Sequence, residues 1–201
     1  AESLSKFVSL DVNYRSTLPI IKVAQALAGT RFTGSGREGE RPSWFMSLSE
    51  DHGVRAAVSW LSSRMEEDPN QLVAVLTANR EEANHVVSLL NPTFGDLARL
   101  GDDSAFSFDE GIVVSPITAV KGLEFPSVLV WDVSAENFPA TEVHRRMLYV
   151  AFTRAEDRLA LVSWGKPSKH ILSISQKLFD LAEEEIEEET TDDVDLSGYG
   201  I

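Results

Sequence analysis

The sequence predicts an α/β domain in which a mainly parallel sheet carries helices on both faces. Apolar, β-branched segments alternate with amphipathic segments along most of the 201 residues, which is the pattern of βαβ units. The strand segments are apolar at nearly every position, as in strands buried on both faces. There is no internal repeat, and a hydrophobic content of 43% is enough for one proper core.

The first half of the chain supplies three strands and three helices to this prediction. A short strand at residues 7–10 precedes a helix at 18–28, which Ser16 or Thr17 caps and Gly29 ends. The next predicted elements are a strand at 42–48, a helix at 54–66 and a strand at 72–76. Asn79 and Glu82 then form a capping pair for the third helix.

The second half begins with an irregular, polar stretch at residues 91–110, which holds a short strand near 97–100. Three more apolar segments predict strands at 112–114, 128–133 and 159–163. Thr141 is expected to cap a helix that runs to about residue 155, and a last helix is expected at 171–181.

Charge divides the chain into a domain at residues 1–181 and an acidic tail at 182–201. Nine acids and no base lie in residues 183–195, and without them the net charge of −14 becomes −5. Such runs usually stay solvated, so we expect a disordered tail, with a partner-binding tail as the alternative. The sequence has no cysteine, no apolar run of membrane-spanning length and no signal peptide; we expect a cytoplasmic protein without membrane contact.

Residues 34–39 form a literal GxGxxG, the spacing of dinucleotide-binding loops. That motif must follow a strand and open a helix. Here it follows a predicted helix and precedes a predicted strand, so we interpret it as a flexible connector.

Three polar groups lie beside predicted strands, at the carboxyl ends where open parallel sheets bind ligands. They are Asn13-Tyr14-Arg15-Ser16, Lys121-Gly122-Leu123-Glu124, and Arg145-Arg146 with Thr153-Arg154. An arginine at such an end can bind phosphate, and a tyrosine can stack on a base. Each group also has an ordinary interpretation: Arg154 complements a helix dipole, Tyr14 belongs to the core, and Lys121 pairs with Glu124 at the surface.

Taken together, residues 13–16, 121–126 and 145–155 resemble motifs IV, V and VI of UvrD-like superfamily 1 helicases. The resemblance covers residues 7–165 and implies the second RecA-like domain of an ATP-dependent DNA motor. It implies that Tyr14 stacks on adenine, that Arg15 and the arginine finger Arg154 contact the γ-phosphate, and that Glu124 contacts the ribose. Gly122, beside Lys121, is expected to let the backbone approach the phosphates, whereas Arg145 and Arg146 are expected to tie their helix into the domain.

The sequence contains no GxxxxGK[ST] phosphate-binding loop. The resemblance therefore implies that ATP and Mg²⁺ are held with a preceding RecA-like domain of the same parent chain, which would supply the Mg²⁺ ligands. The chain opens on Ala1 rather than Met, as a piece of a longer protein would. We expect the isolated chain to have no ATPase activity, and we predict no metal site in it, because its four histidines are scattered without ligand spacing.

Two departures from the family pattern narrow the choice of subfamily. Only 98 residues separate Ser16 from Ser115, where UvrD, Rep and PcrA insert a large subdomain. Pro116 and Thr118 replace the usual motif V Thr-x-His, which weakens the expectation that Ser115 and Thr118 contact nucleic acid. The chain is thus most similar to HelD (helicase IV-like) proteins, which act on RNA polymerase; an ordinary DNA helicase and a non-enzymatic interaction module with vestigial motifs are the alternatives.

Overall fold

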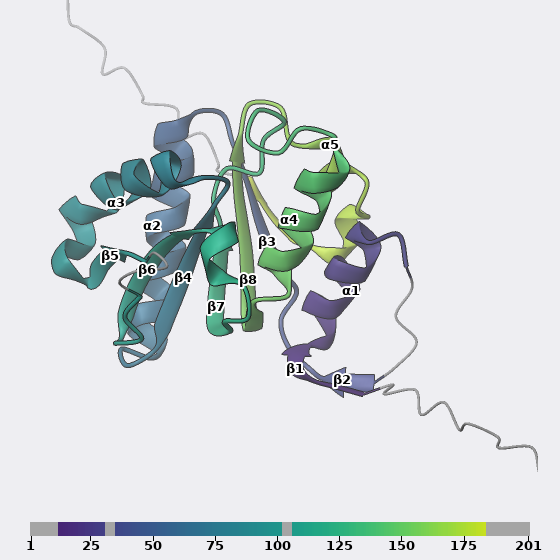
Figure 1. The fold of residues 1–201 in the computed structure, drawn as a ribbon, viewed down its shortest axis with the longest axis horizontal. Coiled ribbons are helices and arrows are strands. Elements are labelled where there is room, and N and C mark those ends of the chain that lie inside the picture. The colour runs from purple at the N-terminus through teal and green to yellow at the C-terminus, as the bar shows by residue number, and fades with distance from the viewer. Residues whose placement is uncertain (1–11, 31–34, 102–105, 184–201) are drawn as a thin grey trace, which may run out of the picture.

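The computed structural model describes residues 12–30, 35–101 and 106–183, and for residues 12–14 and 183 it describes the backbone alone. The main sheet has seven strands, all parallel, in the order β5-β6-β4-β7-β8-β3-β9 (Figure 1). Its strands are β3 (Ser43–Ser47), β4 (Leu72–Thr77), β5 (Ala98–Leu100), β6 (Gly111–Pro116), β7 (Phe125–Val130), β8 (Ala155–Trp164) and β9 (Asp180–Glu183). The predicted fold class, a RecA-like three-layer α/β domain with a mainly parallel sheet, is confirmed.

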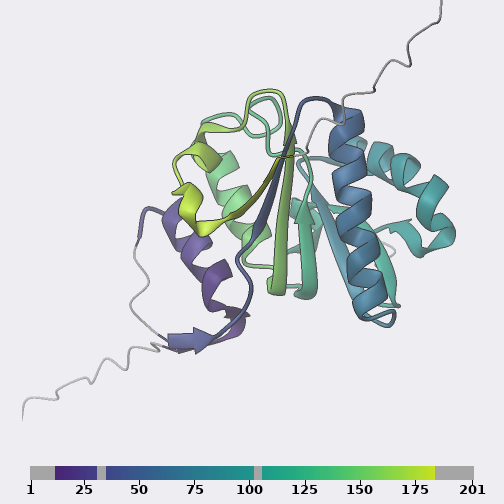
Figure 2. The same cartoon turned by 180° about the vertical axis from the view of Figure 1, so that it is seen from behind.

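Helices cover both faces of the sheet. They are α1 (Leu18–Leu27), α2 (Glu50–Glu67), α3 (Arg80–Phe94), α4 (Glu142–Phe152) and α5 (Lys169–Leu172), with short 3₁₀ helices η1 (Gly95–Leu97), η2 (Ile117–Val120) and η3 (Gln176–Leu178). In Figure 1, α1 and α4 lie in front of the sheet, and Figure 2 shows α2 crossing the opposite face.

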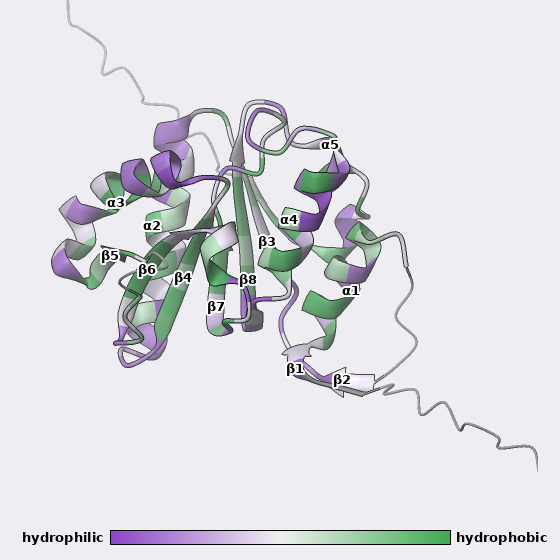
Figure 3. Cartoon of the chain, in the orientation of Figure 1, coloured by the Kyte–Doolittle hydropathy of each residue, from purple (hydrophilic) through white to green (hydrophobic). Residues whose placement is uncertain are grey.

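Successive residues of each strand point to opposite faces, which produces two apolar cores. On β4, Ala74 and Leu76 pack with buried residues of α1 and α4, whereas Val73 and Val75 pack with those of α2 and α3. Figure 3 shows the result, with hydrophobic central strands and hydrophilic outer helix surfaces. Burial on both faces is the reason why the strands are apolar at consecutive positions.

A separate two-stranded parallel sheet lies below α1 in Figure 1. It pairs β1 (Val12–Thr17) with β2 (Ser35–Arg37). The residues of predicted motif IV therefore belong to a strand, and β2 lies within the GxGxxG segment that we interpreted as a connector. The strand predicted at residues 7–10 lies outside the described residues.

The helix predicted at residues 171–181 is wrong. The structure has α5, η3 and the edge strand β9 in its place. The strand forms because β3 offers a free edge, where β9 pairs in parallel and the amide of Asp180 donates to the carbonyl oxygen of Pro42 at 2.9 Å. Of the predicted tail, residues 182–201, only Ala182 and Glu183 are described, and both belong to β9.

Candidate functional site

The start of two neighbouring strands brings predicted motifs V and VI together. Phe125, the first residue of β7, pairs in register with Ala155, the first residue of β8. The amide of Phe125 donates to the carbonyl oxygen of Arg154 at 2.9 Å. Glu124 and Arg154 therefore lie at the amino edge of the sheet, and the expectation of a site at the carboxyl ends is wrong for both residues.

Motif IV reaches the same edge from β1. The hydroxyl of Ser16, which is buried, donates to the carbonyl oxygen of Ala155 at 2.7 Å. Arg15 Nε lies 2.6 Å from Glu124 Oε1, so the two side chains form an ion pair. Residues from β1, the β7 entry and the β8 entry thus converge.

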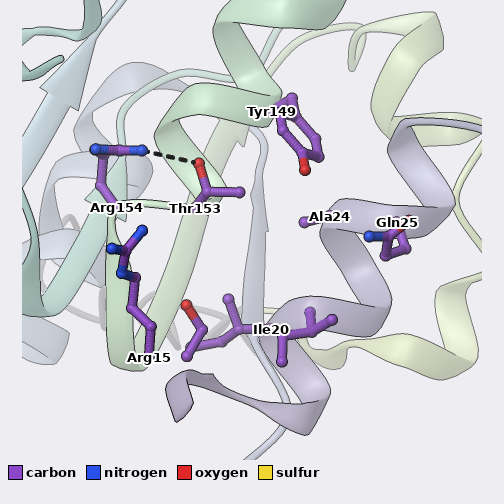
Figure 4. A pocket seen from close by; sticks show the side chains of 9 residues that line it. Arg15, Ile20, Ala24, Gln25, Tyr149, Thr153 and Arg154 are labelled. Carbon is purple, nitrogen blue, oxygen red and sulfur yellow. Dashed lines mark hydrogen bonds between the residues drawn. The ribbon is translucent and has the colours of Figure 1, made fainter. Parts of the chain in front are cut away.

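Arg154 is held on the rim of this site by its own domain. Its Nη1 donates to the carbonyl oxygen of Leu123 at 2.8 Å, and its Nε donates to that of Val150 at 3.2 Å. Figure 4 shows Arg15 pointing toward Arg154 from below. Burial lowers the pKa of Arg154, the carboxylate of Glu124 opposes this change, and the positive charge of Arg15 adds to it. The positive charges of Arg15 and Arg154 repel each other, and an anionic ligand bound between them would reduce this repulsion.

A cavity of about 300 Å³ opens beside the two arginines, between α1 and α4 (Figure 4). Its lining is Arg15, Ser16, Ile20, Ile21, Ala24, Gln25, Tyr149, Thr153 and Arg154. Gln25 and Tyr149 were not predicted as site residues. Tyr149 lies on α4, the helix that ends just before Arg154. Its exposure is visible only in the structure, because in the sequence it belongs to an apolar run that is typical of a core.

Lys121 and Gly122 are exposed on the connector that leads into β7. Gly122 has φ +89°, a conformation that other residues rarely adopt, although an added Cβ atom would have open space. Glycine is therefore needed here for the turn of the backbone. The side chain of Tyr14 lies outside the described part of the chain.

Ser115 and Thr118 lie at the other end of this connector. Ser115, the residue before the last of β6, is fully buried, and its hydroxyl donates to the carbonyl oxygen of Pro116 at 3.3 Å. Thr118 is exposed on η2. Because β6 and β7 are parallel, the connector returns from the carboxyl edge to the amino edge, and it separates Thr118 from Glu124.

The paired arginines of motif VI are not part of this site. Arg145 and Arg146 both bind the carboxylate of Glu142, and these hydrogen bonds lower the pKa of Glu142 to about 2. Arg145 Nη1 also donates to the carbonyl oxygen of Leu27, at the end of α1. Arg145 thus ties α4 to α1, as expected, whereas the ion pair of Arg146 lies within α4 and connects it to no other element.

The residues present fit a phosphate-bearing anion better than a metal ion. Guanidinium groups donate in a planar fork that matches phosphate oxygens, and the charge repulsion between Arg15 and Arg154 favours an anion. Within residues 12–30, 35–101 and 106–183, no group of three or more His, Cys, Asp or Glu is placed to hold a metal ion. In the same residues, no helix has the length and hydropathy to cross a membrane.

Fold and site together define a RecA-like α/β domain with two arginines at the amino edge of its sheet. Residues 111–162 match the family model of the UvrD-like helicase C-terminal domain, a stretch that contains Lys121, Glu124 and Arg154. A similar solved structure is the C-terminal domain of a possible DNA helicase from Lactobacillus plantarum WCFS1. It is 24% identical, with a TM-score of 0.69, over 84% of this chain and 98% of that one. No curated protein sequence matches the chain.

Proposed function

We propose that this chain is the C-terminal motor domain of an ATP-dependent superfamily 1 DNA helicase or translocase. ATP would bind between the amino edge described above and an N-terminal RecA-like domain of the same parent chain, which carries the Walker A loop. The observation that carries the proposal is the convergence of Arg15, Glu124 and Arg154 from three separate segments at one edge. The match of residues 111–162 to the helicase family model supports it.

In this proposal the two arginines act on the transferred phosphoryl group. Phosphoryl transfer needs positioning and stabilisation of negative charge on the γ-phosphate oxygens. Arg154 supplies a permanent positive charge from a rim position that its contacts to Leu123 and Val150 define. Arg15 approaches from the β1 side, and Lys121 adds an exposed charge at the entry to β7.

The base and the sugar are assigned to the remaining motif residues. Glu124 accepts from the ribose hydroxyls, Gly122 allows the backbone to approach the phosphates, and Tyr14 stacks on the adenine. Mg²⁺ would neutralise phosphate charge when bound, and its ligands belong to the N-terminal domain. Thr118 is the exposed candidate for a nucleic-acid contact; Ser115, which is buried, would act by shaping the backbone of that connector.

The test is steady-state ATPase activity of the parent protein with Arg154→Ala, with and without single-stranded DNA. Removal of an arginine finger is expected to lower kcat by roughly 10³–10⁵, with nucleotide binding retained. Arg146→Ala, on α4 shortly before Arg154 in the chain, is the matched control: its side chain is 77% exposed and paired to Glu142, and the change should leave kcat unchanged. An unchanged rate in Arg154→Ala would favour a non-enzymatic module with vestigial motifs.

One observation favours a HelD-like protein over a helicase with an inserted subdomain. The interval between Ser16 and Ser115 is occupied by α1, β2, β3, α2, β4, α3, β5 and β6, all of them elements of the two sheets and their covering layers. A HelD-like parent should release RNA polymerase from nucleic acid in an ATP-dependent manner. Strong stimulation of ATPase activity by single-stranded DNA, without an effect on RNA polymerase, would indicate an ordinary helicase.

A further inference from the structure

The strand β2, within the GxGxxG segment, has no role in the function proposed above. It pairs in parallel with β1 at Asn13–Gly36 and again at Thr17–Arg37. Three residues of β1, among them Arg15, therefore bulge against a single peptide step of β2. In such a bulge the ladder is disrupted, and other donors must satisfy the backbone.

The side chain of Arg37 supplies such donors. Its Nη2 donates to the carbonyl oxygen of Arg15 at 2.7 Å and to that of Glu156 at 3.2 Å. Its Nη1 binds the carboxylate of Asp157 at 2.6 Å. One planar guanidinium group thus connects the bulge of β1 with Glu156 and Asp157, the second and third residues of β8.

These two segments carry the two proposed phosphate-binding arginines. Arg15 is the central one of the three bulged residues, and Arg154 directly precedes β8. The hydroxyl of Ser16 makes a second connection between the same segments, through the carbonyl oxygen of Ala155. The position of the Arg15 side chain relative to Arg154 therefore depends on the contacts that fix this bulge.

We infer that Arg37 is a positioning residue, which acts through the Arg15 backbone to set the distance between Arg15 and Arg154. The inference rests on the proposed function, and it gives the GxGxxG segment a structural task in the ATP site without contact to the nucleotide. A change of about 1 Å in a reacting geometry is enough to lower turnover substantially.

The contribution of Arg37 to positioning can be separated from its contribution to stability. The side chains of Arg37 and Asp157 are 45% and 43% exposed, and ion pairs at that exposure stabilise a fold only slightly. Arg41, four residues after Arg37, is a matched control. Its side chain is similarly exposed, and it pairs with Asp180 of β9, away from Arg15 and β1.

The experiment measures kcat and KM for ATP in the parent protein with Arg37→Ala, Arg37→Lys and Arg41→Ala. We expect Arg37→Ala to lower kcat about tenfold with KM unchanged. Arg37→Lys keeps the positive charge but donates from a single nitrogen and cannot form the fork. It should therefore recover only part of the kcat that Arg37→Ala loses. Arg41→Ala should retain wild-type kcat, and the thermal midpoints of all three should lie close to that of the wild type.

A double variant identifies the route of the effect. If Arg37 acts through Arg15, Arg37→Ala should cost nothing further in an Arg15→Ala background. A raised KM in Arg37→Ala would instead indicate direct nucleotide contact and overturn the inference, as would wild-type kcat in Arg37→Ala beside a collapse in Arg15→Ala. Wild-type kcat in both Arg15→Ala and Arg154→Ala would overturn the proposed function itself.

Discussion

Arg15 Nε lies 2.6 Å from Glu124 Oε1, so the two side chains form an ion pair. In the proposed site they bind different parts of the nucleotide, Arg15 the γ-phosphate and Glu124 the ribose. If Arg15 turns to the γ-phosphate, Glu124 loses this cation, and both of its oxygens become available to the ribose. The ion pair therefore holds the two side chains near the positions in which they would bind the nucleotide. When ATP binds, each side chain would replace its ion-pair partner with a group of the nucleotide.

Glu124→Ala should raise KM for ATP by about tenfold or more, because a hydrogen bond to a charged group is worth about 1.5–3 kcal/mol. Steady-state kinetics with ATP and 3′-deoxy-ATP would measure this. The wild type should prefer ATP, and the variant should lose this preference. Glu38→Ala, which removes an exposed carboxylate beside β2, is the control. A variant that keeps the preference and loses only kcat would show that Glu124 serves to hold Arg15.

The layer structure was predictable from the sequence because the apolar strand segments and amphipathic helices are long. The edge that carries the site was predicted wrongly. Open parallel sheets commonly bind ligands at the carboxyl ends of their strands, and we applied that rule to every polar group beside a predicted strand. Here each crossover returns the chain to the amino edge, so residues directly before β7 and β8, such as Glu124 and Arg154, lie there.

Contacts between segments distant in sequence could not be predicted. Arg37 and Asp157 are 120 positions apart, and no local pattern connects them. The capping pair Asn79–Glu82 depends on neighbouring residues, and it was predicted: Asn79 Oδ1 accepts from the amide of Glu82 at 2.9 Å. Even there, Glu82 binds the amide of Ala78 rather than that of the cap residue.

Gly53 packs closely against Trp164, a contact that the sequence did not indicate and that a substitution can test. The apolar spacing predicted a helix from residue 54, but α2 begins at Glu50 and includes Gly53. A Cβ atom at this position would lie 2.6 Å from Cε3 and 2.9 Å from Cζ3 of Trp164. Trp164 also packs edge-on against Trp131, with ring centroids 5.7 Å apart, so the indole cannot easily move away.

Gly53→Ala should therefore lower the free energy of unfolding by about 1–3 kcal/mol, as overpacking usually does. Chemical denaturation of the chain would measure the change. Ser59→Ala, at an exposed position of the same helix, is the control and should have little effect. A gain of about 1 kcal/mol in Gly53→Ala, the usual effect of alanine in a helix, would show that Trp164 yields.

A pair of carboxylates at the carboxyl edge predicts a dependence of stability on pH. Glu82 Oε2 accepts from the amide of Ala78 at 2.9 Å, and Asn137 Nδ2 donates both to Glu82 and to Asp132 Oδ2. Burial raises the pKa of Glu82 to about 7, opposed by the Ala78 hydrogen bond and assisted by the charge of Asp132. Burial likewise raises the pKa of Asp132.

Because the folded state holds the Glu82 proton more tightly than the unfolded state, the contribution of this group to stability is greatest at low pH. It should fall as pH rises from the unfolded pKa of 4.5 through the folded pKa of about 7. We expect a loss of about 2–3 kcal/mol of unfolding free energy between pH 5 and pH 8 from this group. Urea denaturation across this range should show a flatter profile for Glu82→Gln. Glu81→Gln, at the exposed neighbouring position, should follow the wild type; identical slopes in all three would contradict the assignment.

The proposed half-site makes a prediction about the chain by itself. The chain contains no Walker A loop, so it should hydrolyse no ATP above the buffer rate, since that loop and the Mg²⁺ ligands are proposed to lie in the N-terminal domain. Addition of the separately purified N-terminal half of the parent protein should restore turnover. The same addition to a chain with Arg154→Ala should not, because the trans-acting guanidinium is then missing. Turnover by a clean preparation of the wild-type chain alone would contradict the half-site, whereas restoration by the Arg154→Ala chain would contradict the role of Arg154.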